Sequence, residues 1–319
     1  MATPALRPLS FGEILDGAFV LYRRHFRELF LTAFIPFVPL LVIGLFLLVA
    51  VLTAPPETGS ILVDGSAILA IVYGFAAALW VWTGLAHLFS AAVLGESMGW
   101  RVALRAGRAC VLPVIGAVLI SWMILGVAMA VGGALAFAFS LLLLVILPGG
   151  AGALGAVVIT FTLTVLLVIL PAAIIFVSLS LSLPIIVTEN LRVVESIVRA
   201  WRLMAGARMR GLGLWFVGWL IVLVPSLILF GFFAAIFGIG AVMGLDESEG
   251  AAAISRILSQ LVQPFVGALT TPFTVALLVI LYFDRRVRVE GLDLELADAE
   301  MGWDDEEETL GAETETEGT

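Results

Sequence analysis

The sequence contains no lysine, one cysteine and two histidines, and charged residues make up only 13% of its 319 residues. A single cysteine, Cys110, excludes an intramolecular disulfide and any zinc site built from several cysteines. His25 and His87 fall in different predicted helices, which argues against a two-histidine metal site. P-loop, zinc-protease, CxxC and GxSxG signatures are also missing. We therefore expect no cofactor, no metal and no enzymatic activity.

Apolar side chains are what the sequence has in abundance. Hydrophobic residues make up 62% of the chain, and its mean hydropathy is +1.17. That is more apolar surface than a water-soluble core of this size can bury, so the excess must face lipid. Six apolar runs reach the roughly 20 residues that a membrane-crossing helix needs. These predicted spans are about 30–53, 67–94, 111–147, 154–187, 212–242 and 251–282.

Three arginine-bearing segments alternate with pairs of these runs. In the third, Leu191, Val194, Val198 and Trp201 recur at three- and four-residue steps, which predicts an amphipathic helix on the membrane surface. The first begins at an S-x-x-E capping box. We expect the three surface helices at about 10–27, 96–110 and 189–205. The predicted fold is thus an all-α polytopic membrane bundle with a threefold pattern of surface helix, span and span over residues 1–291.

Charge is distributed unevenly along the chain. From Glu290 onward there are thirteen acidic residues and no basic one, so 292–319 is expected to be a disordered acidic tail. If both termini are cytoplasmic, fifteen of the sixteen arginines lie inside and only Arg256 lies outside. Such a complete positive-inside bias predicts six spans with cytoplasmic N- and C-termini.

Polar side chains concentrate on the second, fourth and sixth predicted spans. Two interpretations are open: they surround a cavity for an amphiphile or solute, or they bond back to their own helix and knit neighbouring helices together. The candidate polar lining consists of Thr83, His87, Ser90, Thr160, Thr164, Ser178, Ser182, Gln260, Gln263, Thr271 and Thr274. For His87, a neutral imidazole hydrogen-bonded across helices is the simpler interpretation, because no intramembrane carboxylate is available as its partner.

The arginine clusters point to membrane lipids as partners. Surface arginines beside spans bind anionic headgroups with about 1 kcal/mol each. A nucleic-acid partner is not expected, because no basic domain with a groove-entering element is present.

Three stretches together resemble a known family: Leu6–Phe26, Leu181–Gly206 and Leu277–Glu295. They are similar to poorly characterised prokaryotic membrane proteins related to the membrane domain of some glycerophosphoryl diester phosphodiesterases. A tyrosine followed by DxRxRxEG, Tyr282–Gly291, is the most distinctive part. The resemblance implies a multi-span helical domain of unknown molecular role in a prokaryotic plasma membrane. The soluble domain that hydrolyses phosphodiesters in fused family members has no counterpart here, so that activity is not expected.

The resemblance also marks a structural ion-pair cluster near the cytoplasmic exit of the last span. Its candidate members are Glu189, Arg202, Asp284, Arg286, Arg288 and Glu290. Contact between Asp284 and Arg202 is a specific hypothesis within this set.

Two functions stay open from the sequence. One is a non-enzymatic membrane domain that binds a partner or organises lipid, with the surface helices and the acidic tail as its cytoplasmic contact face. The other is a transporter or amphiphile-handling protein that uses the polar lining. Absence of buried charge and a threefold, rather than inverted paired, repeat weaken the second.

The topology can be tested with a reporter fused after Thr319. We expect a cytoplasm-active reporter, such as a fluorescent protein, to be active there, and an alkaline phosphatase fusion at the same site to be inactive. The opposite pair of results would contradict the predicted cytoplasmic C-terminus.

Overall fold

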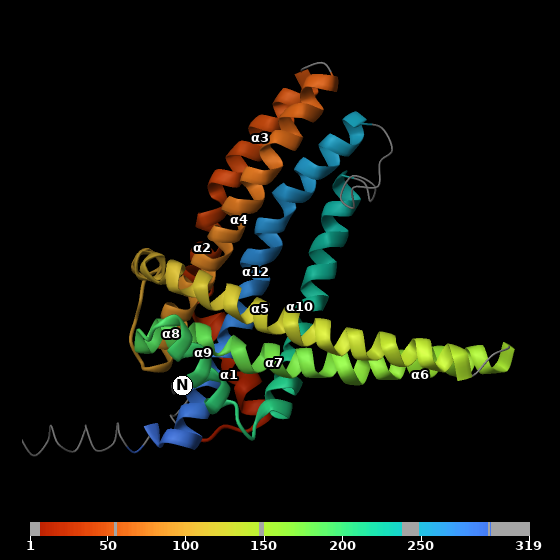
Figure 1. Ribbon diagram of the computed structural model, residues 1–319. Helices are drawn as coiled ribbons and strands as arrows, with labels where there is room; N and C mark the ends of the chain where they lie inside the picture. Colours follow the sequence, from red (N-terminus) through yellow and green to blue (C-terminus); the bar gives the residue numbers. More distant parts are fainter. Residues whose placement is uncertain (1–6, 54–55, 147–149, 238–248, 293, 295–319) are drawn as a thin grey trace, which may run out of the picture.

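A computed structural model describes residues 7–53, 56–146, 150–237, 249–292 and 294 (Figure 1). Every regular element within these ranges is a helix, which confirms the predicted all-α class. The predicted acidic tail, 292–319, lies outside the described residues except for Leu292 and Leu294.

The helices follow one another along the chain with short connections. They are α1 (Phe11–Arg24), α2 (Phe26–Phe34), the 3-10 turn η1 (Ile35–Phe37), α3 (Val38–Thr53), α4 (Pro56–Val93), α5 (Trp100–Ile146), α6 (Gly150–Thr164), the π-helical η2 (Val165–Ile169), α7 (Leu170–Ser180), α8 (Ser182–Glu189), α9 (Val193–Leu203), α10 (Arg208–Phe237) and α12 (Glu249–Glu290).

Six helical stretches are long and apolar enough to cross a membrane, as the sequence predicts. Length and composition therefore make the chain a multi-pass helical membrane protein. The stretches are Phe26–Val51, Ile68–Val93, Trp100–Leu143, Val157–Glu189, Arg208–Ile236 and Gln260–Glu290.

Helix α12 is the centre of the fold. It packs against α1, α2, α3, α4 and α10, and Figure 1 shows it between the α3–α4 pair and α10. In the most apolar part of α12, 67% of the residues are buried. In the most apolar parts of α10 and of the α6–α8 stretch, none of the residues is buried. Tyr282 is completely buried near its C-terminal end. The other long helices therefore leave their apolar side chains on the outside, where lipid can contact them.

The first predicted surface segment begins as expected and ends early. Ser10 and Glu13 form the predicted capping box at the start of α1. The Ser10 backbone N–H donates to Glu13, and this bond, with help from the Ser10 side chain and Arg7, lowers the pKa of the Glu13 carboxyl to about 2. His25 then separates α1 from α2, so the helix predicted for 10–27 stops at Arg24.

Two predicted boundaries were wrong. The surface helix predicted for 96–110 is not separate from the span at 111–147, because α5 runs through both without a break. Its first turns pack so closely on α4 that a Cβ at Gly107 would lie 2.6 Å from the Gly84 nitrogen, and this contact holds the segment in the bundle. The loop predicted between spans one and two is also shorter, since α4 already begins at Pro56, a residue suited to a first helical turn.

The third predicted surface segment is a separate helix. Asn190 adopts a left-handed conformation with φ of 51°, which ends α8, and α9 starts three residues later after an extended Arg192. Because asparagine tolerates this conformation, the chain turns sharply here and α9 leaves the direction of the preceding helix. The segment predicted for 189–205 is thus helical over Val193–Leu203.

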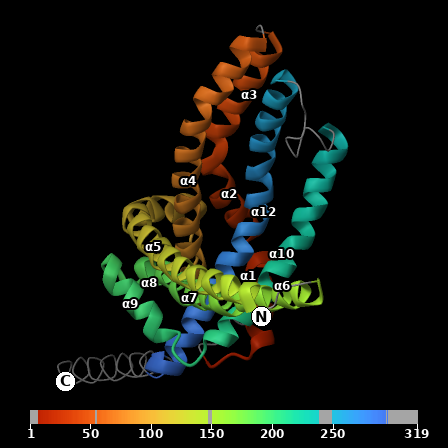
Figure 2. The ribbon, with the colours of Figure 1, turned by 45° about the vertical axis from the view of Figure 1, so that its right-hand side comes forward.

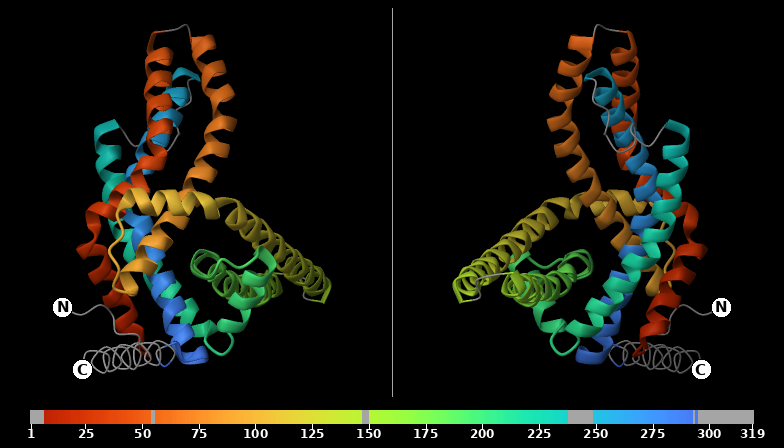
Figure 3. Two further views of the ribbon diagram at one scale, coloured as in Figure 1. Left: turned by 90° about the vertical axis from the view of Figure 1, so that its left-hand side faces the viewer. Right: turned by 90° about the vertical axis from the view of Figure 1, so that its right-hand side faces the viewer.

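The long helices form two diverging arms. Figures 1 and 2 show α3, α4, α10 and α12 extending together, while α5 and the α6–α7 stretch leave them as a second hairpin. Figure 3 shows the same divergence from both sides. Membrane helices usually tilt by about 20° from the bilayer normal. For all six candidate spans to cross one flat bilayer, the angle between the two arms would therefore have to become smaller.

The second arm contains a close backbone contact at a π-helix. Pro171 has no N–H to offer the carbonyl of Leu167 four residues earlier, which accounts for the wider π-helical turn of η2. A Cβ at Gly132 of α5 would overlap that Leu167 carbonyl oxygen, so only glycine fits this position. The α5–η2 contact therefore depends on a missing side chain.

We predict that Gly132→Ala destabilises the protein by about 1–3 kcal/mol, because the added methyl forces α5 away from η2. Gly133→Ala is the matched control, since a Cβ there meets nothing within 4 Å. The measurement is the apparent melting temperature of the purified protein in detergent. Equal melting temperatures for the two variants would show that this close contact does not exist.

Candidate functional site

The ionisable groups gather where α12 ends, against the N-terminal segment, α9 and the start of α10. The carboxylate of Asp284 has no exposed side-chain surface. It accepts hydrogen bonds from the Leu9 backbone N–H at 2.8 Å and from Arg288 Nε at 2.9 Å. Arg210 of α10 pairs with it at 3.4 Å. One buried charge thus joins three segments that are far apart in the sequence.

Leu9 completes this first network through its carbonyl oxygen. Arg210 and Arg288 both donate to it, at 2.5 and 2.6 Å. Each guanidinium therefore binds a carboxylate and a backbone oxygen at the same time, an arrangement that satisfies buried polar groups on both sides. The N-terminal segment is fixed to α12 just before α1 begins.

A second network surrounds the hydroxyl of Tyr282. This hydroxyl donates to Glu189 at 2.7 Å and accepts from Thr188 at 2.8 Å. Arg199 of α9 pairs with Glu189 at 2.5 Å and with Glu290 at 3.1 Å, and Arg286 also reaches Glu290 at 3.1 Å. Two acids and two arginines thereby lock the α8–α9 corner onto α12.

Arg285 lies between these two networks and makes backbone contacts instead of ion pairs. Its Nε donates to the Leu203 carbonyl at 2.9 Å, and its Nη2 donates to the Ala205 carbonyl at 3.3 Å. These are carbonyls at the C-terminal end of α9, where a helix leaves acceptors without partners and favours a positive charge. Arg285 therefore caps α9 from α12.

Five of the six predicted cluster residues take part in these networks, namely Glu189, Asp284, Arg286, Arg288 and Glu290. The predicted contact between Arg202 and Asp284 was wrong. Arg202 is exposed and makes no ion pair with any described residue. Arg199, one helical turn earlier, occupies the inward position instead. Arg199, Arg210 and Tyr282 were not predicted as cluster members, because most of their partners come from segments more than 70 residues away and no local spacing reveals them.

Several residues of the predicted polar lining bond to their own helix. Thr83 donates to the Trp80 carbonyl at 2.9 Å, Thr164 to Thr160 and Ser178 to Ile174. Such bonds satisfy a hydroxyl in apolar surroundings without any cavity. His87 faces α5, where its Nε2 lies 3.7 Å from the sulfur of Cys110. Ser90 Oγ is buried and has no hydrogen-bond partner within the described part of the chain.

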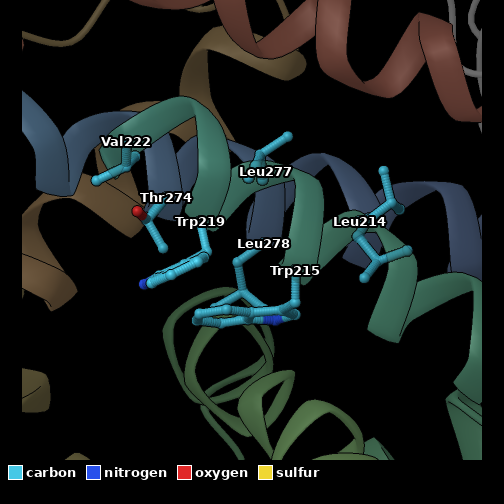
Figure 4. Close-up of a pocket in the computed structure, with 9 residues that line it drawn as sticks. Leu214, Trp215, Trp219, Val222, Thr274, Leu277 and Leu278 are labelled. Carbon is cyan, nitrogen blue, oxygen red and sulfur yellow. The ribbon is translucent and has the colours of Figure 1, made fainter. Parts of the chain in front are cut away.

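The remaining lining residues face different cavities. Gln260, Gln263 and Thr271 line a space of about 350 Å³ between α12 and the α3–α4 pair. Ser182 faces an adjoining cavity of about 300 Å³ at the fork between the two arms, and the two cavities share Ala78 and Trp82. Thr274 borders a small pocket of about 70 Å³ between α10 and α12, beside Trp215 and Trp219 (Figure 4). No single space among the described residues collects the predicted lining.

Helix α9 has one face buried and another exposed. Ile197, Ala200 and Leu203 are buried against the bundle. The opposite side carries apolar side chains flanked by arginines, and we call it the α9 surface; it consists of Arg192, Val194, Val198, Trp201 and Arg202. Val194 is 62% exposed and Val198 is 43% exposed. The four apolar positions predicted for this helix therefore include residues that face away from the protein.

Cations dominate the α9 surface. Arg192 and Arg202 are exposed, and neither makes an ion pair with a described carboxylate. The guanidinium of Arg208 lies 3.9 Å from the centre of the Trp201 ring, a cation–π contact that adds a third positive charge beside the surface. Arginines without a described carboxylate partner and exposed apolar side chains therefore meet on this surface, as they also do at Arg101, Val102 and Arg105 of α5.

Comparison with family models, curated proteins and solved structures gave no match. The resemblance to the phosphodiesterase-associated membrane domain therefore stays a prediction.

We predict that Asp284→Asn lowers the free energy of unfolding by about 1–3 kcal/mol, because the partly exposed guanidinium groups of Arg210 and Arg288 lose the buried carboxylate with which they pair. Asp16→Asn is the control: Asp16 is exposed on α1, and we expect its loss to change stability by less than about 0.5 kcal/mol. Thermal unfolding in detergent and the monodisperse yield after purification measure both. Equal stability of the two variants would contradict the role of Asp284.

Proposed function

We propose that this chain is a non-enzymatic integral membrane protein that binds anionic lipid headgroups at its arginine-bearing end and so organises lipid around itself. The α9 surface carries the proposal. Its apolar side chains match the acyl boundary of a bilayer, and its arginines match the phosphate level. The same helix packs against α5, α7 and α8, and Arg199 pairs with Glu290 of α12, which together keep that surface in place.

Ion pairing within the protein decides which arginines are free for lipid. Arg199, Arg210, Arg286 and Arg288 already pair with Glu189, Asp284 and Glu290, so three of their four charges are compensated within the protein. Arg192 and Arg202 have no such partner. At about 1 kcal/mol for each arginine near an anionic surface, these two together favour an anionic over a neutral headgroup by roughly 2 kcal/mol.

The proposed orientation places the α9 surface at the cytoplasmic leaflet of a prokaryotic plasma membrane, with both termini on that side. Support comes from the positive-inside bias of the sequence. Packing adds to it, because α1, α9, the start of α10 and the end of α12 meet around Asp284 and Glu290. The family resemblance agrees with this assignment and adds no activity.

A transporter is the weaker candidate. Its polar lining would have to face one pathway, whereas the hydroxyls of Thr83, Thr164 and Ser178 are bonded to their own helices. The buried charges lie in the networks at the end of α12 rather than along a cavity between helices, which argues against ion coupling.

We predict that the double variant Arg192→Gln and Arg202→Gln retains less anionic lipid than the unmodified protein. The chain would be extracted from bacterial membranes in native nanodiscs, and the ratio of phosphatidylglycerol to phosphatidylethanolamine measured by mass spectrometry. A lower ratio is expected because each substitution removes an unpaired charge at the headgroup level.

The control for this experiment is Arg7→Gln. Arg7 already pairs with Glu13, so its loss should leave the lipid ratio unchanged. An unchanged ratio in the double variant, or an equal fall in the control, would contradict lipid binding at the α9 surface.

A further inference from the structure

A groove runs beside the α9 surface, between α9 and the last turn of α12. Its volume is about 620 Å³. Apolar side chains from both helices line it, together with two arginines and two glutamates; the lining residues are Leu191, Val194, Glu195, Val198, Arg199, Arg202, Leu203, Val289 and Glu290. Val289 is 54% exposed at its edge, so the apolar strip continues onto α12.

The charges of this groove are not equivalent. Glu290 is held by Arg199 and Arg286, and Glu195 accepts the N-cap N–H of α9. Arg202 has no described partner, and Arg192 and Arg208 add two more cations nearby. An occupant that is both apolar and strongly acidic therefore fits better than a neutral one.

The sequence after α12 has that chemistry. Residues 295–319 contain eleven acidic side chains and no basic one, and five of the acids follow directly after Trp303 as Asp304–Glu308. Residues 1–6, at the other end of the chain, contain no acidic residue. Charge complementarity thus selects the C-terminal segment, and Trp303 supplies an aromatic side chain for the apolar strip.

Distance favours the same occupant. Val289 and Glu290 line the groove, Gly291 ends α12 with φ of 69°, and the described chain stops at Leu294. The nine residues from Leu294 to Trp303 span up to roughly 30 Å when extended, which is enough to reach any part of α9. A segment tethered at the rim of its own groove also has an effective concentration of about millimolar.

We propose that residues 301–308 dock in this groove, with Trp303 on the apolar strip and the following acids opposite Arg192 and Arg202. The docked segment covers the arginines assigned to headgroups under the proposed function, so the tail and anionic lipid compete for the α9 surface. The competition between tail and lipid rests on the proposed function, whereas the docking of the tail does not.

The docking can be tested by cross-linking in the full-length chain. A photoreactive phenylalanine derivative replaces Met301, the protein is placed one copy per nanodisc in phosphatidylcholine, and cross-linked peptides are mapped by mass spectrometry. We expect the main products within 191–203 and at Val289. The double variant Arg192→Glu and Arg202→Glu should lower their yield about tenfold, since two attractive surface contacts become repulsive.

Arg24→Glu is the matched control, because it makes the same charge change at an exposed arginine of α1 and should leave the yield unaltered. The milder Arg192→Gln and Arg202→Gln pair repeats the comparison should the charge reversal impair folding. Products confined to lipid or spread evenly over the chain, or a yield unaffected by either double variant, would overturn docking in the groove.

Discs containing phosphatidylglycerol separate the two proposals. A lower cross-link yield in these discs than in phosphatidylcholine is the result expected from competition. A yield that stays equal while the products still map to α9 would overturn competition and headgroup binding at this surface, and would leave the docked tail supported.

Discussion

The buried carboxylate of Asp284 is the contact on which the arrangement of this protein depends. Once it lies in the interior it needs compensating donors, since an unpaired buried charge costs several kcal/mol. The Leu9 N–H, Arg288 and Arg210 supply them from the N-terminal segment, α12 and α10. Each donor can reach the carboxylate only when its own segment is in place, so one charge fixes the relative positions of all three.

Tyr282 fixes the position of α8 and α9 against α12 in a similar way. Its buried hydroxyl sits between Thr188 and Glu189, and Glu189 in turn holds Arg199 of α9. Because lipid tails are as apolar as the helices themselves, such polar contacts and close packing, rather than exclusion of water, must hold membrane helices together. The second arm has neither a described ion pair nor a buried charge, and it relies on the small residue Gly132 at η2. This difference agrees with its divergence from the first arm.

Composition alone was enough to predict six apolar helices, because a span must be long and apolar whatever it packs against. The start of α1 was also predictable, since a capping box is local. Packing between distant segments was not predictable. The close contact of Gly84 and Gly107 holds the start of α5 on α4, and after the turn at Asn190 the side chain of Arg199 lies inward and that of Arg202 outward. The family resemblance grouped Asp284, Arg286, Arg288 and Glu290 in one cluster, but it could not choose between Arg199 and Arg202, two arginines three residues apart.

The arginines therefore divide into two classes by what neutralises them. Those facing α12 are held by carboxylates or backbone oxygens and stabilise the fold, whereas Arg192 and Arg202 stay uncompensated on the outer side of α9. The same helix needs both classes, because its inner face must be fixed before its outer face has a defined position at the membrane. An uncompensated pair of charges next to exposed Val194 and Val198 favours an acidic, partly apolar ligand. Headgroups and the residues after Trp303 both have that chemistry, which is why we propose that they compete for the α9 surface.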